Sequence, residues 1–294
     1  MSHRGRVWTA LGAVYLIWGS TYLFIALAVK TLHPLFAVST RFIAAGTIMA
    51  AIVLAKGGSM RASARSIGSC VVIGCLLPGA NAVLFFAERN VPIGLASLII
   101  ASVPLWVVVM RVTARERLPA PVFAGVGVGF AGVALLANPS GGATTGGIAL
   151  CVLSSVMWAT GSFASRHLPL PADPFTATAY EMLGGGLVML PFGIATMGTF
   201  APSTQSVLAW VYLVTMGSLV GFSAYVWLLA RAPIGLVSTY AYVNPVVAIV
   251  LGVLFRGEHL SWRIAVGAAI VVSSVAIVLR QEQPPAHGEE GVHS

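Results

Sequence analysis

Two ionisable side chains lie inside apolar stretches of this sequence, at matching places. Arg41 ends the segment HPLFAVSTR and Glu181 ends DPFTATAYE, each seven residues after a proline that can open a helix. A charge near the centre of a membrane-spanning helix costs about 2.5–3.5 kcal/mol on insertion scales, so such residues usually have a functional role. The pair therefore marks a candidate site for binding an ionic group or for carrying a proton.

The alternatives for this pair concern depth in the membrane. A residue seven positions into a helix lies about 10 Å deep, so either side chain could extend to the nearer membrane surface. Buried charges more often face the interior of a helix bundle and meet a partner there. For Arg41 the partner nearest in depth is Glu88, with Glu181 about 10 Å further away. A buried Glu181 could instead bind a coupling proton.

The composition indicates what kind of protein carries these charges. Of 294 residues, 58% are hydrophobic and 8% are charged, against about 25% charged in soluble domains. The lipid bilayer is therefore an expected partner. The net charge of +8 does not predict a nucleic-acid partner, because the basic residues lie at the ends of the apolar runs and not on one surface.

Ten apolar runs are long enough to cross a bilayer, which predicts an all-α integral membrane fold with ten transmembrane helices. The expected spans are 7–29, 34–55, 66–87, 92–110, 119–138, 147–166, 174–198, 206–230, 233–254 and 262–280. With the N terminus inside, eleven Lys and Arg residues fall in cytoplasmic segments and four in external ones. This bias predicts a multi-pass inner (plasma) membrane protein with both termini in the cytoplasm.

The chain also repeats itself. Trp18 matches Trp158 at an offset of 140 residues, PIGLAS matches PIGLVS at 141, and Glu116 matches Glu258 at 142. This indicates a duplication, with a first repeat at 1–140 and a second repeat at 141–294 that ends in a short cytoplasmic tail. Five spans per copy make the repeats inverted, an arrangement typical of proteins that expose one central site to either side in turn.

These segments resemble a known family. IWGSTYLFI, the proline-to-arginine spacing around Arg41, AERNVPIGLASLIIASVPLW and YAYVNPVVAIVLGVLFRGE are together similar to the drug/metabolite transporter superfamily, in its ten-helix branch with two EamA domains. The resemblance covers residues 8–280. It implies a secondary transporter, usually an exporter of amino acids or other small metabolites, and it gives Arg41 a role in transport.

Further candidates for a binding site lie at mid-membrane. Pro104 and Pro245 each break a helix and free the carbonyl four residues earlier, at Ile100 and Ala241. Tyr240 and Asn244 share a helix face beside the second proline. The remaining substrate-binding candidates are polar or aromatic residues of the first, third, sixth and eighth spans: Trp18, Ser20, Thr21, Tyr22, Asn81, Trp158, Thr160 and Tyr225. Packing between helices is the alternative for each of them.

Other function classes lack support in the sequence. No phosphate-binding loop with its lysine occurs, no paired carboxylates or His-based nucleophile lie in the spans, and no metal-ligand spacing is present. We therefore expect no enzyme activity, no cofactor and no metal. Gly125 and Gly129 favour close helix packing within a monomer, and a homodimer seam is the alternative.

The expected function is export of a small amphipathic metabolite, such as an amino acid, by alternating access, with protons as a candidate coupling ion. A passive facilitator or channel and a multidrug efflux protein are the alternatives, and an intramembrane enzyme is less favoured.

Overall fold

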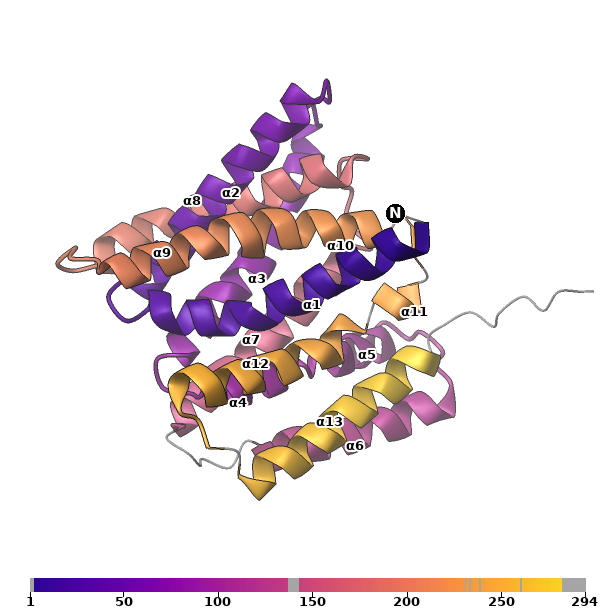
Figure 1. The fold of residues 1–294 in the computed structure, drawn as a ribbon. Coiled ribbons are helices and arrows are strands. Elements are labelled where there is room, and N and C mark those ends of the chain that lie inside the picture. The colour runs from indigo at the N-terminus through magenta and orange to yellow at the C-terminus, as the bar shows by residue number, and fades with distance from the viewer. Residues whose placement is uncertain are drawn as a thin grey trace, which may run out of the picture.

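The computed structural model describes residues 3–136, 143–229, 231–232, 234–237, 239–259 and 261–281, and these ranges contain helices and no strand (Figure 1). The all-α prediction is therefore confirmed for them. In chain order the elements are α1 (His3–Ala28), α2 (Pro34–Ala55), α3 (Ala64–Ala87), α4 (Ile93–Ile100), α5 (Val103–Thr113), α6 (Ala120–Leu136), α7 (Thr145–Ala164), α8 (Pro174–Thr196), α9 (Thr204–Tyr212), the π-helix η1 (Leu213–Val220), α10 (Gly221–Leu229), α11 (Ile234–Val237), α12 (Tyr240–Arg256) and α13 (Trp262–Gln281).

Seven segments of the described chain are long and apolar enough to cross a membrane. Three further apolar helices, Ala120–Leu136, Tyr240–Arg256 and Trp262–Val278, are shorter. These segments coincide with the ten predicted spans, but the count of ten transmembrane helices stays a prediction. The fourth span is divided into α4 and α5, the eighth contains η1, and the ninth is divided into α11 and α12.

The connections between helices gather at two ends of the bundle. We call the end at which α1 begins the near end and the opposite end the far end. At the far end, Thr31 after α1 bonds Ser203 before α9, and the amide of Thr144 before α7 donates to the carbonyl of Asn90 after α3. At the near end, the Tyr180 hydroxyl of α8 donates to the carbonyl of Met60 at 2.5 Å. The described connections thus tie the two halves of the chain at both ends.

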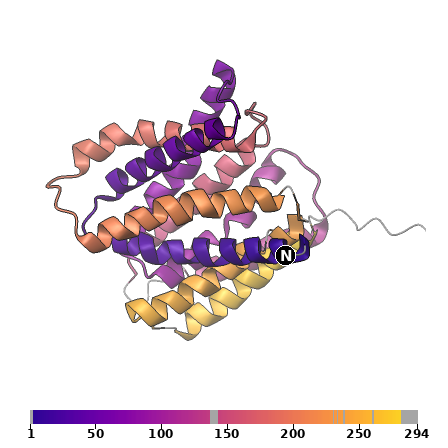
Figure 2. The ribbon, with the colours of Figure 1, turned by 45° about the horizontal axis from the view of Figure 1, so that its top comes forward.

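The halves of the chain interleave. Helix α2 packs along α8, α3 lies between α7 and α8, and α6 pairs with α13. In both ribbon views α1 runs between α9–α10 on one side and α12 on the other (Figure 2). Helices of the first and second halves therefore alternate around the centre of the bundle.

Short polar side chains and prolines fix where the helices begin. Ser63, Thr144, Asp173 and Ser203 each accept a hydrogen bond from an amide of the first turn of α3, α7, α8 and α9. Pro34 and Pro174 occupy the first turns of α2 and α8, where a missing N–H costs nothing.

Glycines set the closest helix crossings. A Cβ at Gly74 of α3 would overlap the Glu181 carbonyl of α8, so these two backbones touch. A Cβ at Gly125 of α6 would lie 3.0 Å from Val278 of α13. The glycine face of α6 is therefore covered within the chain.

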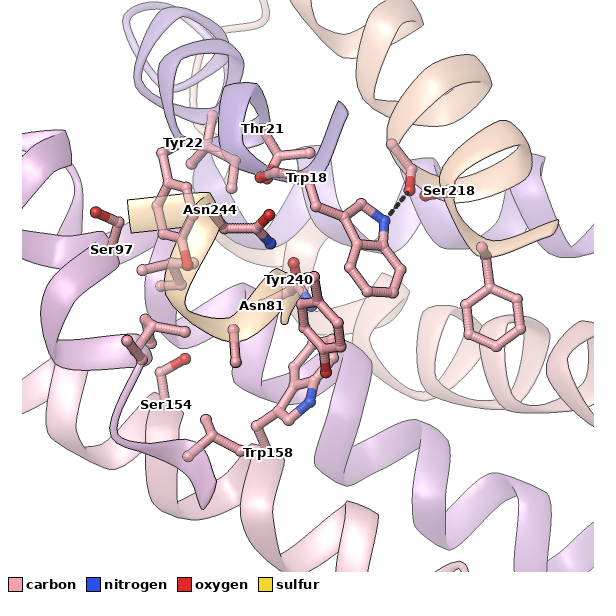
Figure 3. Close-up of a pocket in the computed structure, with 18 of the residues that line it drawn as sticks. Trp18, Thr21, Tyr22, Asn81, Ser97, Ser154, Trp158, Ser218, Tyr240 and Asn244 are labelled. Carbon is pink, nitrogen blue, oxygen red and sulfur yellow. Dashed lines mark hydrogen bonds between the residues drawn. The ribbon is translucent and has the colours of Figure 1, made fainter. Parts of the chain in front are cut away.

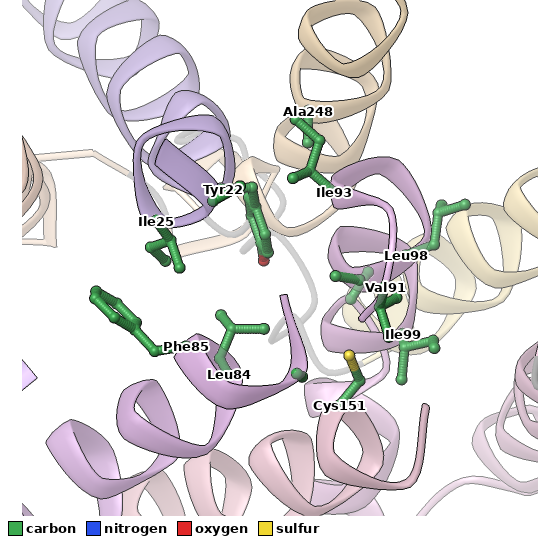
Figure 4. Packing of buried hydrophobic residues seen from close by; sticks show 14 of the residues in the cluster. Tyr22, Ile25, Leu84, Phe85, Val91, Ile93, Leu98, Ile99, Cys151 and Ala248 are labelled. Carbon is green, nitrogen blue, oxygen red and sulfur yellow. The ribbon is translucent and has the colours of Figure 1, made fainter. Parts of the chain in front are cut away.

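The far half of the bundle holds a dense apolar core. Its largest members are fully buried and come from helices of both halves (Figure 4). They include Ile25, Phe85, Ile93, Leu98 and Ile99, and the smaller Cys151 and Ala248 lie among them. This core closes the far end of the space described next.

Candidate functional site

A cavity of about 200 Å³ lies at the centre of the bundle, where α1, α2, α3, α7, α8, η1 and α12 converge around the α4–α5 break. Most of the residues singled out from the sequence line it (Figure 3). They are Trp18, Thr21, Tyr22, Arg41, Asn81, Trp158, Tyr240 and Asn244, together with Pro104 and Pro245. Residues up to 227 positions apart in the sequence thus surround one space.

Three aromatic rings form one wall toward the near end. The ring of Trp18 lies 5.1 Å from that of Tyr225 and 5.2 Å from that of Tyr240, and the two tyrosine rings are 5.6 Å apart. These spacings are those of tilted and edge-to-face aromatic pairs. Tyr225 supports the wall from behind and does not itself line the cavity. The wall joins α1 to α10 and α12.

The π-helix places two polar groups at the cavity that the sequence did not predict. Its wider turns alter the backbone hydrogen bonding of an otherwise α-helical span, a feature often found at functional sites. The indole Nε1 of Trp18 donates to the carbonyl of Gly217 at 3.2 Å. Ser218, the next residue, turns its hydroxyl toward α2 and accepts from Arg41 Nε at 3.1 Å.

Arg41 is buried, with 5% of its surface exposed, and it lines the cavity. Its guanidinium lies over the Phe42 ring at 5.0 Å, and its Nη1 has no hydrogen-bond partner within the described residues. A buried guanidinium with a free donor is well suited to an anionic ligand group, because Arg binds carboxylates through paired N–H bonds.

Arg41 is placed differently from the expectation based on depth, which named Glu88 as its nearest partner. Among the described residues it forms no ion pair with Glu88 or Glu181, and it bonds Ser218 instead. Glu88 follows the end of α3, where its carboxylate is buried without a hydrogen-bond partner in the described chain, and Glu181 packs its backbone on Gly74. Neither carboxylate lines the cavity. Depth along a helix did not specify which way these side chains face.

Asn244 supplies the second free polar group. It is buried on α12, and its Oδ1 has no partner within the described residues. Asn81, on α3, uses its Nδ2 to donate to the Leu77 carbonyl of its own helix at 3.3 Å. Two residues that line the cavity therefore carry a buried polar atom with no partner among the described residues: a donor, Arg41 Nη1, and an acceptor, Asn244 Oδ1.

The two helix breaks differ from each other. Pro104 lies in the first turn of α5, directly after the interruption at Ala101 and Ser102, whereas Pro245 lies inside α12, beyond an interruption that ends at Thr239. Ile100 and Ala241, whose carbonyls the prolines were expected to free, both line the cavity.

A serine of α7 stabilises the first break. The Ser155 hydroxyl donates to the Ile99 carbonyl at 3.1 Å, which satisfies a backbone group at the end of α4.

Two predicted residues face away from the cavity. The Ser20 hydroxyl bonds the Ile17 carbonyl and the Tyr212 hydroxyl, and the Thr160 hydroxyl bonds the Val156 carbonyl of its own helix. Several lining residues had not been predicted: Ser97, Ser154, Met182, Gly217, Ser218 and Phe222. The Gly-Ser pair in the middle of an apolar span was the one available signal for the π-helix.

The chain is similar to known proteins over nearly its whole length. The sequence model of the EamA-like transporter family matches residues 5–138 and 145–280. The "Uncharacterized inner membrane transporter YedA" of Escherichia coli (strain K12) is 34% identical over 278 residues, covering 92% of this chain and 89% of that protein. "Protein PecM" of Dickeya dadantii is 28% identical, covering 89% of this chain and 88% of that protein.

A third relative carries a more specific name. The "Probable terminal-alkyne amino-acid exporter" of Streptantibioticus cattleyicolor is 29% identical, covering 79% of this chain and 80% of that protein. Among solved structures, a protein crystal structure with 23% identity superposes with a TM-score of 0.65, covering 94% of this chain and 96% of that chain. That likeness shows a shared fold.

Proposed function

Because the chain belongs to the EamA-like transporter family, we propose that it exports a small amphipathic solute, such as an amino acid, across the inner membrane by alternating access. One observation carries the choice of solute. The lining of the central cavity includes Arg41 and Asn244, whose Nη1 and Oδ1 have no partner among the described residues, together with Trp18, Trp158 and Tyr240.

Each of these groups fits one part of such a solute. Arg41 can bind a carboxylate through its unused donor, and the Asn244 oxygen can accept a hydrogen bond from an ammonium or amide group. The aromatic faces offer apolar surface and attract cations. One relative of this chain is named a probable amino-acid exporter, which supports a solute of this class.

The size of the cavity favours a small solute. Its volume of about 200 Å³ lies below the roughly 300–1,000 Å³ of pockets that hold drug-sized ligands. A multidrug efflux function would need a larger space than this conformation provides.

Access to the cavity supports transport by alternation. Toward the far end its lining is buried, as Ile25, Leu84 and Ser97 show. Toward the near end Trp158 and Phe222 are partly exposed. We infer that this conformation is open at the near end and closed at the far end. The distribution of basic residues predicts that the near end faces the cytoplasm.

Inverted repeats would supply the opposite conformation. If the two family domains are related by inversion, exchanging their conformations opens the far end and closes the near end around the same cavity. An N-terminal tag tests the orientation: it should be labelled only after the cells are permeabilised, and labelling from outside intact cells would contradict a cytoplasmic near end.

Thermal stabilisation of the purified protein tests the solute class. A ligand that binds only the folded state at one hundred times its Kd stabilises it by about 2.7 kcal/mol. We expect a rise in Tm with one or more apolar or aromatic amino acids, and no rise with the same compounds in Asn244→Leu. If no amino acid raises the Tm, or if the rise persists in the variant, the proposed solute class or its site is wrong.

A further inference from the structure

At the far end, a glutamate from the second half of the chain forms hydrogen bonds with the start of a helix of the first half. Glu258 lies in the connection between α12 and α13. Its Oε1 accepts from the amide of Ile93 at 2.7 Å, and its Oε2 accepts from the amide of Gly94 at 3.0 Å. Charge-assisted bonds to the first turn of a helix are among the stronger hydrogen bonds in proteins. The carboxylate thereby fixes the beginning of α4.

Two glycines leave room for the Glu258 carboxylate. A Cβ at Gly252 would lie 2.5 Å from Glu258 Oε2, and one at Gly94 would lie 3.3 Å from it. Gly257, just before the glutamate, has a φ of +65° and turns the chain back toward α4. Larger side chains at Gly252 would push the carboxylate away.

The turn of α4 that Glu258 bonds leads directly into a wall of the cavity. Ser97, Ile100 and Ala101 follow the held turn of α4 and line the cavity directly. Ser97 is fully buried. The turn that Glu258 holds is therefore continuous with the far wall of the cavity.

The first half of the chain carries the counterpart of this glutamate. Glu116 precedes Glu258 by 142 residues, and PIGLVS repeats the PIGLAS segment that Glu258 holds. Arg115 has a φ of 61°, close to the 65° of Gly257 at the same offset, and it is the one non-glycine residue with positive φ in the described chain. Such a backbone is uncommon for a residue with a side chain. The positive-φ backbone conformation of the residue just before the glutamate is therefore present in both copies.

The partners of the two glutamates nevertheless differ. Glu116 accepts from Arg111 Nε at 2.6 Å on its own half of the chain, and 38% of its side chain is exposed. An exposed ion pair of this kind contributes little to stability. One glutamate is thus engaged with the other half of the chain, and its counterpart is not.

We propose that Glu258 and Glu116 are alternating clasps, of which Glu258 closes the far end in this conformation and Glu116 closes the near end in the opposite one. In that opposite conformation Glu258 releases Ile93 and Gly94. Glu116 leaves Arg111 and bonds the backbone of the PIGLVS segment at Ile234 and Gly235. The proposal rests on alternating access as the mode of transport, and it adds the residues that hold each end.

The labelling rate of a single cysteine tests the clasps without any substrate. The reporter is Ser97→Cys in a background where Cys70, Cys75 and Cys151 are replaced by Ala, and the probe is a bulky, charged maleimide added to sealed vesicles from the far-end side only. Glu258→Gln weakens the clasp at the far end, so labelling should become about tenfold faster, as expected when a charge-assisted bond is lost. Gly252→Ala should act in the same direction while leaving every charge in place.

Variants of the Arg111–Glu116 pair separate the clasp from simple loss of an ion pair. Glu116→Gln removes the clasp of the opposite conformation and should slow labelling. Arg111→Gln breaks the same pair but frees Glu116, and it should speed labelling. The proposal is overturned if these two variants shift the rate in the same direction, or if Glu258→Gln and Gly252→Ala both leave it unchanged. A failed transport assay with the expected labelling pattern would instead count against the proposed solute.

Discussion

The guanidinium of Arg41 on α2 donates from Nε to the hydroxyl of Ser218 in the π-helix at 3.1 Å, while its Nη1 has no partner within the described chain. One hydrogen bond thus orients the arginine, and another donor is left for a ligand. This relationship joins the first half of the chain to the second at the centre of the cavity.

Arg41 should be essential for transport. Arg41→Ala removes the charge that binds the anionic group of the solute, so solute affinity should fall by about tenfold or more. Arg41→Lys keeps the charge but not the planar fork, and should recover transport only partly. Ser218→Ala, which removes only the orienting bond, should have a smaller effect. Uptake assays on the three variants at equal expression should rank their losses of transport in this order. Wild-type activity in Arg41→Ala would show that the arginine is not part of the site.

Asn244 should be needed for transport but not for folding. Asn244→Leu keeps the branching of the side chain and removes its unpartnered acceptor, so transport should be lost while membrane insertion and yield stay near those of the wild type. Thr160→Val is the matched control, because the Thr160 hydroxyl bonds its own helix outside the cavity. Equal transport in both variants would show that Asn244 serves packing alone.

Glu181 is predicted to affect the pH dependence of transport. It lies outside the cavity, so Glu181→Gln should leave solute affinity close to that of the wild type. If the carboxyl carries a coupling proton, the variant cannot release one, and its transport rate should vary less with pH. Rates measured across a pH series decide this, and an unchanged profile would eliminate the proton role.

The α3–α8 crossing should be sensitive to a single methyl group. Gly74→Ala places a Cβ against the α8 backbone, and overpacking of this kind costs about 1–3 kcal/mol. Gly68→Ala on the same helix meets nothing within 4 Å and should be neutral or stabilising, since Ala is the better helix former. Thermal unfolding in detergent should show a lower Tm for Gly74→Ala only, and equal Tm values would indicate that the crossing relaxes freely.

Hydropathy located the helices well because the length of a span is set by the bilayer. The predicted second span, 34–55, coincides with α2, and residues of widely separated spans such as Trp18 and Asn244 do meet at one cavity. Their residue types and central depth were sufficient to suggest a shared site.

Other features of the site could not be predicted from the sequence. The π-helix at Gly217 and Ser218 changes the backbone hydrogen-bond register, for which the sequence gives only a weak signal. Ser20 and Thr160 were wrong as cavity residues because hydroxyls in membrane helices readily bond carbonyls of their own preceding turn. Arg41 bonds Ser218 in this conformation and not Glu88, because spacing gives depth along a helix but not the direction in which a charged side chain points.

Counterflow in proteoliposomes tests the central claim most directly. Vesicles containing the purified protein are loaded with an unlabelled apolar amino acid that raises its Tm, and uptake of the labelled compound from dilute external solution is followed. A carrier that alternates around the Arg41–Asn244 cavity should accumulate the label transiently above its equilibrium level, and Asn244→Leu should abolish this overshoot. Simple equilibration with no overshoot, or an overshoot that persists in Asn244→Leu, would contradict transport by alternation around this cavity.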